Sequence, residues 1–476
     1  MLFNSFEFML FFPIVFALHW GLPHRFRWIL LLAASYFFYM CWDPAFILLI
    51  LFDTAVTYTA GRLLTRWEDP KRRKWVLGVS LFLCFAVLFV FKYLEFAWSQ
   101  FALLVGIVGW HPDPELVKIA LPVGISFYTF QTVSYVIDVY RGKVKAEKHF
   151  GIYAAFISFF PQLVAGPIER TGNLLPQIRS EKTFDSDGAM YGLRLMIVGF
   201  FKKMCIADVL SVYVDRIFNH LGEKTGFAVV LAMIFFTLRI YCDFSGYSDI
   251  AIGSAKIMGI DLMKNFKSPY FSSSIREFWS RWHISLSTWF KDYVYIPLGG
   301  NRKGKLRTCF NLMITFLVSG IWHGANWTFV LWGALHGAGQ VAERLLLPKT
   351  DRNRAVRCLR VALTFLFCMF AWVFFRANSV SDAFLSFRLM TEGIGNVKQY
   401  ISSGLAGMEL THVAIIKIAV TVGILTVYDL FAYRQDMITW LGKRSAGVRI
   451  VLTCLMLAVI LLTFATTPSE FVYFQF

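Results

Sequence analysis

The chain has 476 residues, of which 57% are hydrophobic and only 16% charged, and its formal net charge is +17. A water-soluble domain usually has about 25% charged residues, so this composition excludes a chain that is soluble throughout. The apolar runs are continuous and do not alternate with polar residues, which favours membrane helices over a transmembrane β-barrel.

Uncharged runs mark the membrane segments. Residues 8–24, 76–91 and 450–467 contain no Asp, Glu, Lys or Arg. About 18 apolar residues suffice to span a bilayer, and shorter runs can be tilted or half-buried. The first run is expected to be a retained helix and not a signal peptide, since no basic segment precedes it and no cleavage site follows it.

Short basic clusters separate the apolar runs, and they predict the orientation. Residues 23–27, 62–74 and 141–148 are basic, so we place these loops in the cytoplasm and the intervening turn at residues 43–44 outside. A segment at 98–110 is expected at the outer interface, and 119–140 is expected to return. Such clusters are typical of membrane topology, and we expect no nucleic acid partner. Later cytoplasmic clusters are residues 302–307, 352–360 and 443–449.

The middle of the chain, about residues 150–275, has Gly, Pro and polar residues within apolar stretches. This pattern indicates broken or re-entrant helices, which are tolerated where protein or a water-filled cavity surrounds them. We expect roughly 11–13 membrane segments in one all-α integral-membrane domain, residues 1–476. The eight cysteines have no CxxC spacing, so neither a metal site nor a disulfide framework is expected.

Residues 308–342 contain no Asp, Glu, Lys or Arg. One straight helix of this length would be about 52 Å long, against a hydrocarbon core of about 30 Å. We therefore predict a break at residues 324–326, beside His323. A histidine there can take a proton from an attacking hydroxyl, or it can simply be hydrogen-bonded to a neighbouring helix. His336, in the same run, is expected to have a packing or hydrogen-bonding role.

Residues 275–294 show a helical apolar stripe and a polar row on another face. This pattern predicts an amphipathic interfacial helix, and the alternative is a helix that lines a channel. The charged side chains of Arg276, Glu277 and Arg281 are expected to pair with one another or to face water. The polar row consists of Arg276, Ser280, His283, Ser287 and Lys291.

Asp243 and Asp249 lie at or near membrane depth in residues 239–249. Carboxylates there need a reason, and structural pairing is the favoured one; the others are orienting a histidine or capping a helix. The sequence has no phosphate-binding glycine loop and no GxSxG motif.

Three strings carry a resemblance to a known family: residues 278–290 (FWSRWHISLSTWF), 292–300 (DYVYIPLGG) and 319–327 (SGIWHGANW). Together they resemble the membrane-bound O-acyltransferase family, in the bacterial branch typified by the alginate O-acetylation membrane protein. The densest motifs lie in residues 150–345. Further matches are residues 160–168, 241–253, 265–270 and 474–476.

The resemblance implies a bowl of tilted helices with a central tunnel. It implies that His323 is the catalytic histidine and that His283 has an auxiliary, polarising or positioning role. Low-weight candidates for substrate binding or tunnel lining are Trp322, Asn326, Trp327, Ser287, Arg281, Asp243, Asp249 and Tyr241.

The function implied is transfer of an acetyl group from a cytoplasmic thioester, with acetyl-CoA as the expected donor, to an extracellular or cell-wall polysaccharide. The resemblance also implies a bacterial inner-membrane location, contact with membrane lipid and an extracytoplasmic SGNH-type acetyltransferase as partner. Two alternatives are a D-alanyl exporter of the same family and a non-catalytic conduit or flippase. A transporter would be expected to show internal repeats, and the sequence shows none.

Overall fold

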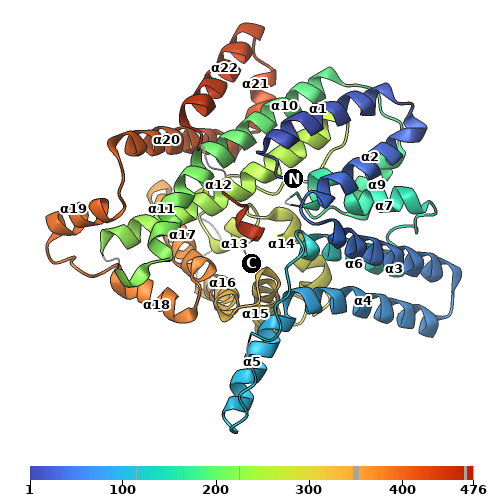
Figure 1. Ribbon diagram of the computed structural model, residues 1–476, viewed down its shortest axis with the longest axis horizontal. Coiled ribbons are helices and arrows are strands. Elements are labelled where there is room, and N and C mark those ends of the chain that lie inside the picture. The colour runs from blue at the N-terminus through green and yellow to red at the C-terminus, as the bar shows by residue number, and fades with distance from the viewer. Residues whose placement is uncertain (114, 165, 224–225, 347–352, 466–468, 475–476) are drawn as a thin grey trace. The chain divides into compact units, whose positions relative to one another are not determined.

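The computed structural model describes residues 1–476 except 114, 165, 224–225, 347–352, 466–468 and 475–476. All regular elements within the described residues are helices (Figure 1), as the composition predicts. Ala165, Gln475 and Phe476 of the quoted motifs, and the end of the 450–467 run, lie outside the described residues.

Contacts within the chain gather in two compact units. Unit 1 comprises Met1–Leu193 and Ala251–Met263, and unit 2 comprises Arg194–Ile250 and Lys264–Phe476. The prediction of a single integral domain, and of a bowl with a tunnel, therefore stays a prediction.

The helices of unit 1 are α1 (Phe6–Gly21), α2 (His24–Met40), a 3-10 turn η1 (Pro44–Phe46), α3 (Ile47–Arg66), α4 (Pro70–Lys92), α5 (Leu94–Gly106), α6 (Ile125–Tyr140), α7 (Phe150–Ser158), α8 (Phe160–Leu163) and α9 (Thr171–Arg179). α3, α4 and α6 pack together as a bundle (Figure 1). α7 to α9 are short pieces, as expected for the start of the 150–275 region. α6 begins six residues later than predicted, because Gly124 is left-handed at φ 75° and ends the preceding turn.

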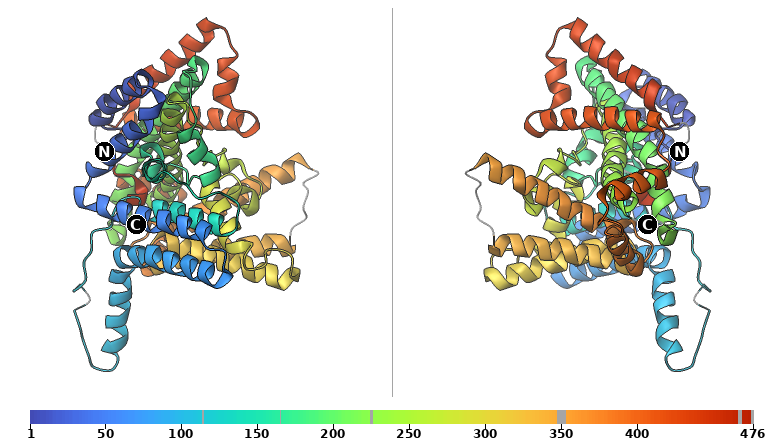
Figure 2. Two further views of the ribbon diagram at one scale, coloured as in Figure 1. Left: turned by 90° about the vertical axis from the view of Figure 1, so that its right-hand side faces the viewer. Right: turned by 90° about the vertical axis from the view of Figure 1, so that its left-hand side faces the viewer.

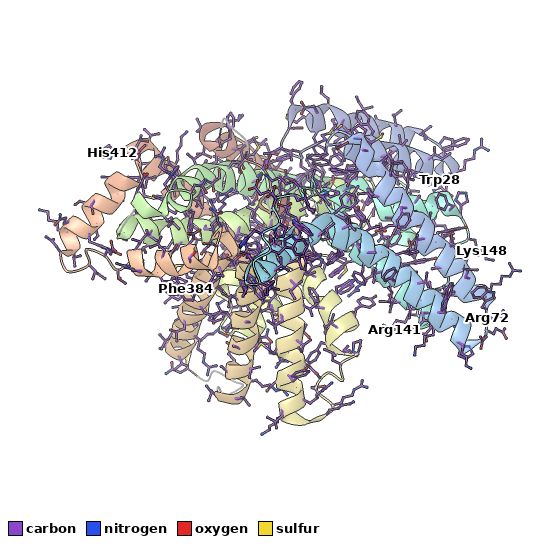
Figure 3. The ribbon with its side chains drawn as sticks, turned by 60° about the horizontal axis from the view of Figure 1, so that its bottom comes forward. Trp28, Arg72, Arg141, Lys148, Phe384 and His412 are labelled. Atoms are coloured by element: carbon purple, nitrogen blue, oxygen red, sulfur yellow. The ribbon has the colours of Figure 1, made fainter. Side chains whose placement is uncertain are left out.

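Two basic clusters of unit 1, residues 62–74 and 141–148, lie at the same end of the bundle. The Arg73 guanidinium donates to the backbone oxygen of Tyr140 at 2.9 Å, which joins the start of α4 to the end of α6. Figure 3 shows Arg72, Arg141 and Lys148 at this end. Their common position is what a cytoplasmic assignment of these loops requires.

Unit 2 contains a π-helix η2 (Phe201–Ala207), α11 (Asp208–Phe218), the 3-10 turns η3 (Leu221–Glu223) and η4 (Pro269–Phe271), α13 (Ile275–Trp279), α14 (Ile284–Phe290), a π-helix η5 (Lys291–Tyr295), α15 (Gly304–His323), α16 (Trp327–Leu346), α17 (Arg354–Arg376), α18 (Val380–Leu389), α19 (Val397–Gly407), α20 (His412–Arg434), α21 (Met437–Gly442), α22 (Ala446–Thr463) and a 3-10 turn η6 (Val472–Phe474). α10 (Ser186–Phe200) and α12 (Phe227–Ile257) each contribute residues to both units. Within residues 150–275, α12 is one helix of 31 residues, and the shorter elements precede and follow it.

Small residues allow α10 and α12 to run side by side (Figure 1). A Cβ atom at Gly199 would lie 2.7 Å from the carbonyl oxygen of Gly246, and one at Gly246 would lie 2.8 Å from that of Gly199. Close backbone approach of this kind is how helices associate in lipid, where burial of apolar surface gives no advantage.

Six helical segments among the described residues are long and apolar enough to cross a membrane, and α1 and α5 are shorter apolar helices. The chain is thus a multi-pass membrane protein. The number of 11–13 segments, which includes broken ones, stays a prediction. The six are Pro44–Arg66, Pro70–Lys92, Phe227–Ile257, Arg354–Arg376, His412–Arg434 and Ala446–Thr463.

Candidate functional site

The predicted break within residues 308–342 is confirmed. α15 ends at His323, Gly324 is extended, and α16 starts at Trp327. The carboxamide oxygen of Asn326 accepts from the backbone N–H of Thr328 at 3.0 Å, which caps the first turn of α16. His323 therefore stands at the tip of a helical hairpin whose turn has only three residues. Figure 2 shows α15 and α16 as neighbouring antiparallel helices.

His323 is 3% exposed and is surrounded by aromatic rings. Its ring centroid lies 4.9 Å from both Trp322 and Trp332, 5.2 Å from Phe375 and 5.7 Å from Tyr473. These rings come from α15, α16, α17 and η6. A histidine in such a site is shielded from bulk water, so a reacting group that reaches it would be shielded as well.

His283 lies in a break that the sequence pattern did not predict. The expected continuous helix over residues 275–294 is wrong, since α13 ends at Trp279 and α14 starts at Ile284. Between them His283 is left-handed at φ 42°, a conformation that is uncommon for residues other than glycine. Asn265 holds the turn, because its backbone oxygen accepts from the N–H of Ile284 at 2.9 Å.

The structure brings the two predicted histidines to one aromatic cluster. Trp322, whose contact with His323 is given above, lies 6.3 Å from the fully buried ring of His283. Tyr473, the other shared neighbour, lies 6.4 Å from His283. Phe244 of α12 packs edge-on against His283 at 4.6 Å. A strained backbone at a buried histidine, next to a second buried histidine, is typical of a functional site.

A cavity of about 1340 Å³ lies in unit 2. Its lining includes residues that are close to each of the two histidines in the sequence. Ile284 and Ser319 line it, one residue after His283 and one helical turn before His323. Of the polar row predicted for residues 275–294, every member except His283 lines this cavity, which favours the channel-lining alternative. Its charged lining residues are the basic Arg276, Lys291, Arg302, Lys305, Arg344 and Arg360 and the acidic Glu343.

Other candidates from the sequence occupy different places. Arg281 pairs with Glu277 at 3.0 Å, as expected for charges near this helix. Trp327 is 53% exposed. The amide of Asn326, besides capping α16, donates to the backbone oxygen of Asn378 at 3.0 Å. Ser287 lines the cavity.

The two predicted carboxylates pair structurally. Asp249 accepts from Lys202 at 2.8 Å, and Asp243 lies 2.7 Å from Lys203. Both partners are lysines. Tyr241 lies beside the first of these pairs, since Nζ of Lys202 is 5.7 Å from the centroid of its ring. Its hydroxyl donates to Asp429 at 3.0 Å.

His336 has the structural role that was expected of it. The indole N–H of Trp279 donates to Nδ1 of His336 at 3.2 Å, so Nδ1 is the acceptor and any proton sits on Nε2. His336 is fully buried among aromatic side chains.

Sequence reasoning missed Lys202, Lys203 and Tyr473. Two adjacent lysines within the apolar run before Asp208 were a readable signal, because charged residues at membrane depth are rare and costly. Tyr473 gave no such signal, since only the fold brings the end of the chain to His323.

Comparison with known proteins gives the family. The family model for membrane-bound O-acyltransferases matches residues 149–381. A probable alginate O-acetylase AlgI of Pseudomonas putida is 38% identical, with both chains fully covered. A peptidoglycan O-acetyltransferase of Helicobacter pylori is 31% identical over 94% of this chain and 91% of its own. A teichoic acid D-alanyltransferase of Bacillus subtilis is 27% identical over 56% of this chain and 70% of its own.

The matched region contains both predicted histidines and the cavity, and the acetyltransferase relatives extend over nearly the whole chain. The chain therefore belongs to the membrane-bound O-acyltransferase family, in the branch of the alginate O-acetylases, and is a membrane O-acetyltransferase.

Proposed function

We propose that this protein transfers an acetyl group from a cytoplasmic thioester towards a hydroxyl group of an extracellular or cell-wall polysaccharide, with His323 as catalytic base. The observation that carries the proposal is the position of His323: a buried histidine at a three-residue helix break, which shares an aromatic cluster with His283. This arrangement supports proton transfer away from bulk water.

The reaction needs one proton carrier. A ring nitrogen of His323 takes the proton of the acceptor hydroxyl while the oxygen attacks the thioester carbonyl carbon. The carbon–sulfur bond then breaks, and the leaving thiolate takes the proton back from the imidazolium. His283 positions or polarises the reacting groups and is not a second nucleophile.

Acetyl-CoA is the donor that we propose. The cavity lined by Ile284 and Ser319, close sequence neighbours of the two histidines, has six basic lining residues and one acidic one. The carboxylate of Glu343 already accepts from the backbone N–H groups of Ile275, at 2.6 Å, and Arg276, at 3.2 Å. The remaining positive charge suits the phosphates of coenzyme A, because arginine and lysine bind phosphate through charge-assisted hydrogen bonds.

The names of the relatives support the acceptor and the location that we propose. Proteins named for the acetylation of alginate and of peptidoglycan support a polysaccharide acceptor. We propose that the acetyl group reaches it directly or through an extracytoplasmic SGNH-type acetyltransferase, and that the protein lies in the bacterial inner membrane. Of the other candidates, Trp322 forms a wall of this site, Ser287 lines the cavity and Asn326 caps α16. Arg281, Tyr241, Asp243 and Asp249 belong to structural pairs.

D-alanyl transfer is the second candidate, supported by the more distant resemblance to a teichoic acid D-alanyltransferase. Both reactions place an acyl thioester against a hydroxyl, so the same histidine would serve. A non-catalytic conduit would not need His323 to accept a proton.

Complementation tests the proposal. A strain without its native protein receives the wild-type chain or His323→Ala, and the acetyl content of its envelope polysaccharide is measured with the amount of protein in the membrane. We expect loss of acetylation at unchanged protein level. Full acetylation by His323→Ala would overturn the catalytic role, and D-alanine in place of acetyl would favour the second candidate.

A further inference from the structure

The C-terminal segment, residues 469–473, reaches the aromatic cluster around His323. Phe471 and Val472 are buried. The ring of Tyr473 packs near both histidines, with centroids 6.4 Å from His283 and 5.7 Å from His323. Phe244 also packs against Tyr473, with ring centroids 4.7 Å apart. The segment thus forms one wall of the site.

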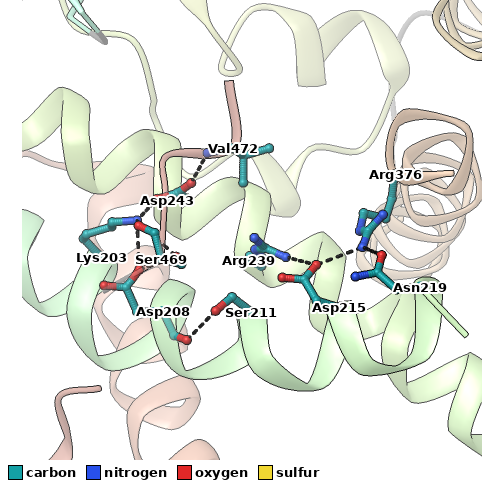
Figure 4. Close-up of polar contacts among 10 residues, drawn as sticks. All are labelled: Lys203, Asp208, Ser211, Asp215, Asn219, Arg239, Asp243, Arg376, Ser469 and Val472. Carbon is teal, nitrogen blue, oxygen red and sulfur yellow. Dashed lines mark hydrogen bonds and ion pairs between the residues drawn. The ribbon is translucent and has the colours of Figure 1, made fainter. Parts of the chain in front are cut away.

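Three charged side chains hold this segment (Figure 4). Nζ of Lys203 lies 2.8 Å from the carboxylate of Asp208 and 2.7 Å from that of Asp243. It also donates to the backbone oxygen of Ser469 at 3.0 Å. We call Lys203, Asp208 and Asp243 the clamp.

The C-terminal segment donates two hydrogen bonds to the carboxylates of the clamp. The hydroxyl of Ser469 donates to Asp208 at 2.6 Å. The backbone N–H of Val472 donates to Oδ2 of Asp243 at 2.7 Å. Each carboxylate of the clamp therefore touches both Lys203 and the segment, so the segment is part of the ionic group and not merely beside it.

The local backbone explains how the lysine is buried. Lys203 lies in the π-helix η2, and its side chain is 0% exposed. π-helical turns are rare and are found frequently at functional sites. Gly246 of α12 lets this turn approach, since a Cβ atom there would lie 3.0 Å from the backbone nitrogen of Lys203. A buried charge is costly unless it is paired, and the two carboxylates of the clamp provide that pairing for Lys203.

We infer that the clamp fixes the C-terminal segment so that Tyr473 closes one side of the acyl-transfer site, which makes Lys203, Asp208 and Asp243 positioning residues. This inference rests on the proposed role of His323. The clamp itself lies beyond the ring contacts of His323, so its effect on the reaction must pass through Val472 and Tyr473.

One hydrogen bond between the segment and the clamp can be removed without replacing a clamp residue. Val472→Pro deletes the N–H that Asp243 accepts, and Val472→Ala shortens the side chain but keeps the N–H. We expect Val472→Pro to lower polysaccharide acetylation at least tenfold and Val472→Ala to change it less than threefold, at equal protein level. Equal activity of the two variants would overturn the inference. Should Val472→Pro fail to reach the membrane, Ser469→Ala decides, and wild-type acetylation by that variant would overturn it.

A double-mutant cycle separates positioning from general stability. Lys203→Met and Val472→Pro break the same connection, so the double variant is expected to be about as active as the weaker single one. The control is Asp215→Asn, which breaks a neighbouring ion group with Arg239 and Arg376 that does not include the segment (Figure 4). In the double variant Asp215→Asn/Val472→Pro, the two fold-losses of acetylation should multiply.

If the fold-losses of Lys203→Met and Val472→Pro also multiplied in their double variant, the result would contradict the clamp. His323→Ala in the same assay tells the two failures apart: a null His323→Ala with a fully active Val472→Pro refutes only the clamp.

Discussion

Gly320 of α15 and Gly333 of α16 pack backbone against backbone, so that a Cβ atom added to either would lie 3.3 Å from the Cα of the other. It would lie nearer still to a carbonyl oxygen: 2.3 Å from that of Phe329 for Gly320, and 2.4 Å from that of Phe316 for Gly333. This crossing sits one turn before His323. The closeness of the two helices is what allows a three-residue turn to present that histidine.

Gly320→Ala is therefore expected to force the hairpin apart and to misplace His323. Overpacking of this kind costs about 1–3 kcal/mol of unfolding free energy. Thermal unfolding of the detergent-solubilised protein, followed by tryptophan fluorescence, measures the loss, and acetylation should fall with it. The matched control is Gly423→Ala in α20, where an added Cβ meets no atom within 4 Å. An unfolding temperature of Gly320→Ala equal to that of Gly423→Ala would contradict the packing argument.

The basic cavity gives a second prediction. Arg302→Gln and Lys305→Gln remove positive charge from its wall, so the KM for acetyl-CoA should rise about tenfold, the equivalent of one charge-assisted hydrogen bond. The kcat should change little, because we assign these charges to donor binding and the proton transfer to His323. Steady-state kinetics on isolated membranes measures both constants. Arg72→Gln, in the first turn of α4 in unit 1, is the control for net charge. A KM unchanged by the cavity variants would mean that the donor binds elsewhere.

Orientation can be tested separately. The loop with Arg72 is expected in the cytoplasm, and the segment after α5, with Glu115, is expected outside. Single cysteines at these positions, in a chain whose exposed Cys41, Cys358 and Cys454 are replaced, are treated with a membrane-impermeant maleimide on intact cells. Label on Glu115→Cys and none on Arg72→Cys is the predicted outcome. The reverse pattern would invert the topology and place the donor on the wrong side.

The sequence predicted the parts that depend on one segment at a time. The break after His323 followed from length alone, because 35 uncharged residues cannot cross a bilayer as one straight helix. The family strings then selected His323 and His283. Neither argument depends on which segments meet in three dimensions.

Long-range contacts were beyond the sequence. The apolar stripe of residues 275–294 predicted one helix, but the left-handed turn at His283 is held by Asn265, which lies in a different segment. The pairing of Asp243 with Lys203, and the return of Tyr473 to His323, likewise join parts of the chain that no periodicity connects. Tertiary contacts override a local pattern where they satisfy polar groups that the pattern leaves out.

The central claim is that His323, and not simply any buried histidine of the hairpin, carries the proton transfer. The most direct test compares His323→Gln with His336→Gln, since both replace a buried histidine in α15–α16 by a side chain that can still form hydrogen bonds. Acetyl transfer per amount of folded protein is measured in the same membranes. His323→Gln is predicted to lose at least about 100-fold of the activity, the contribution of a general base, while His336→Gln stays within a few-fold of wild type. A His323→Gln variant that keeps more than about a tenth of the wild-type rate, well above what loss of a general base allows, would contradict the account.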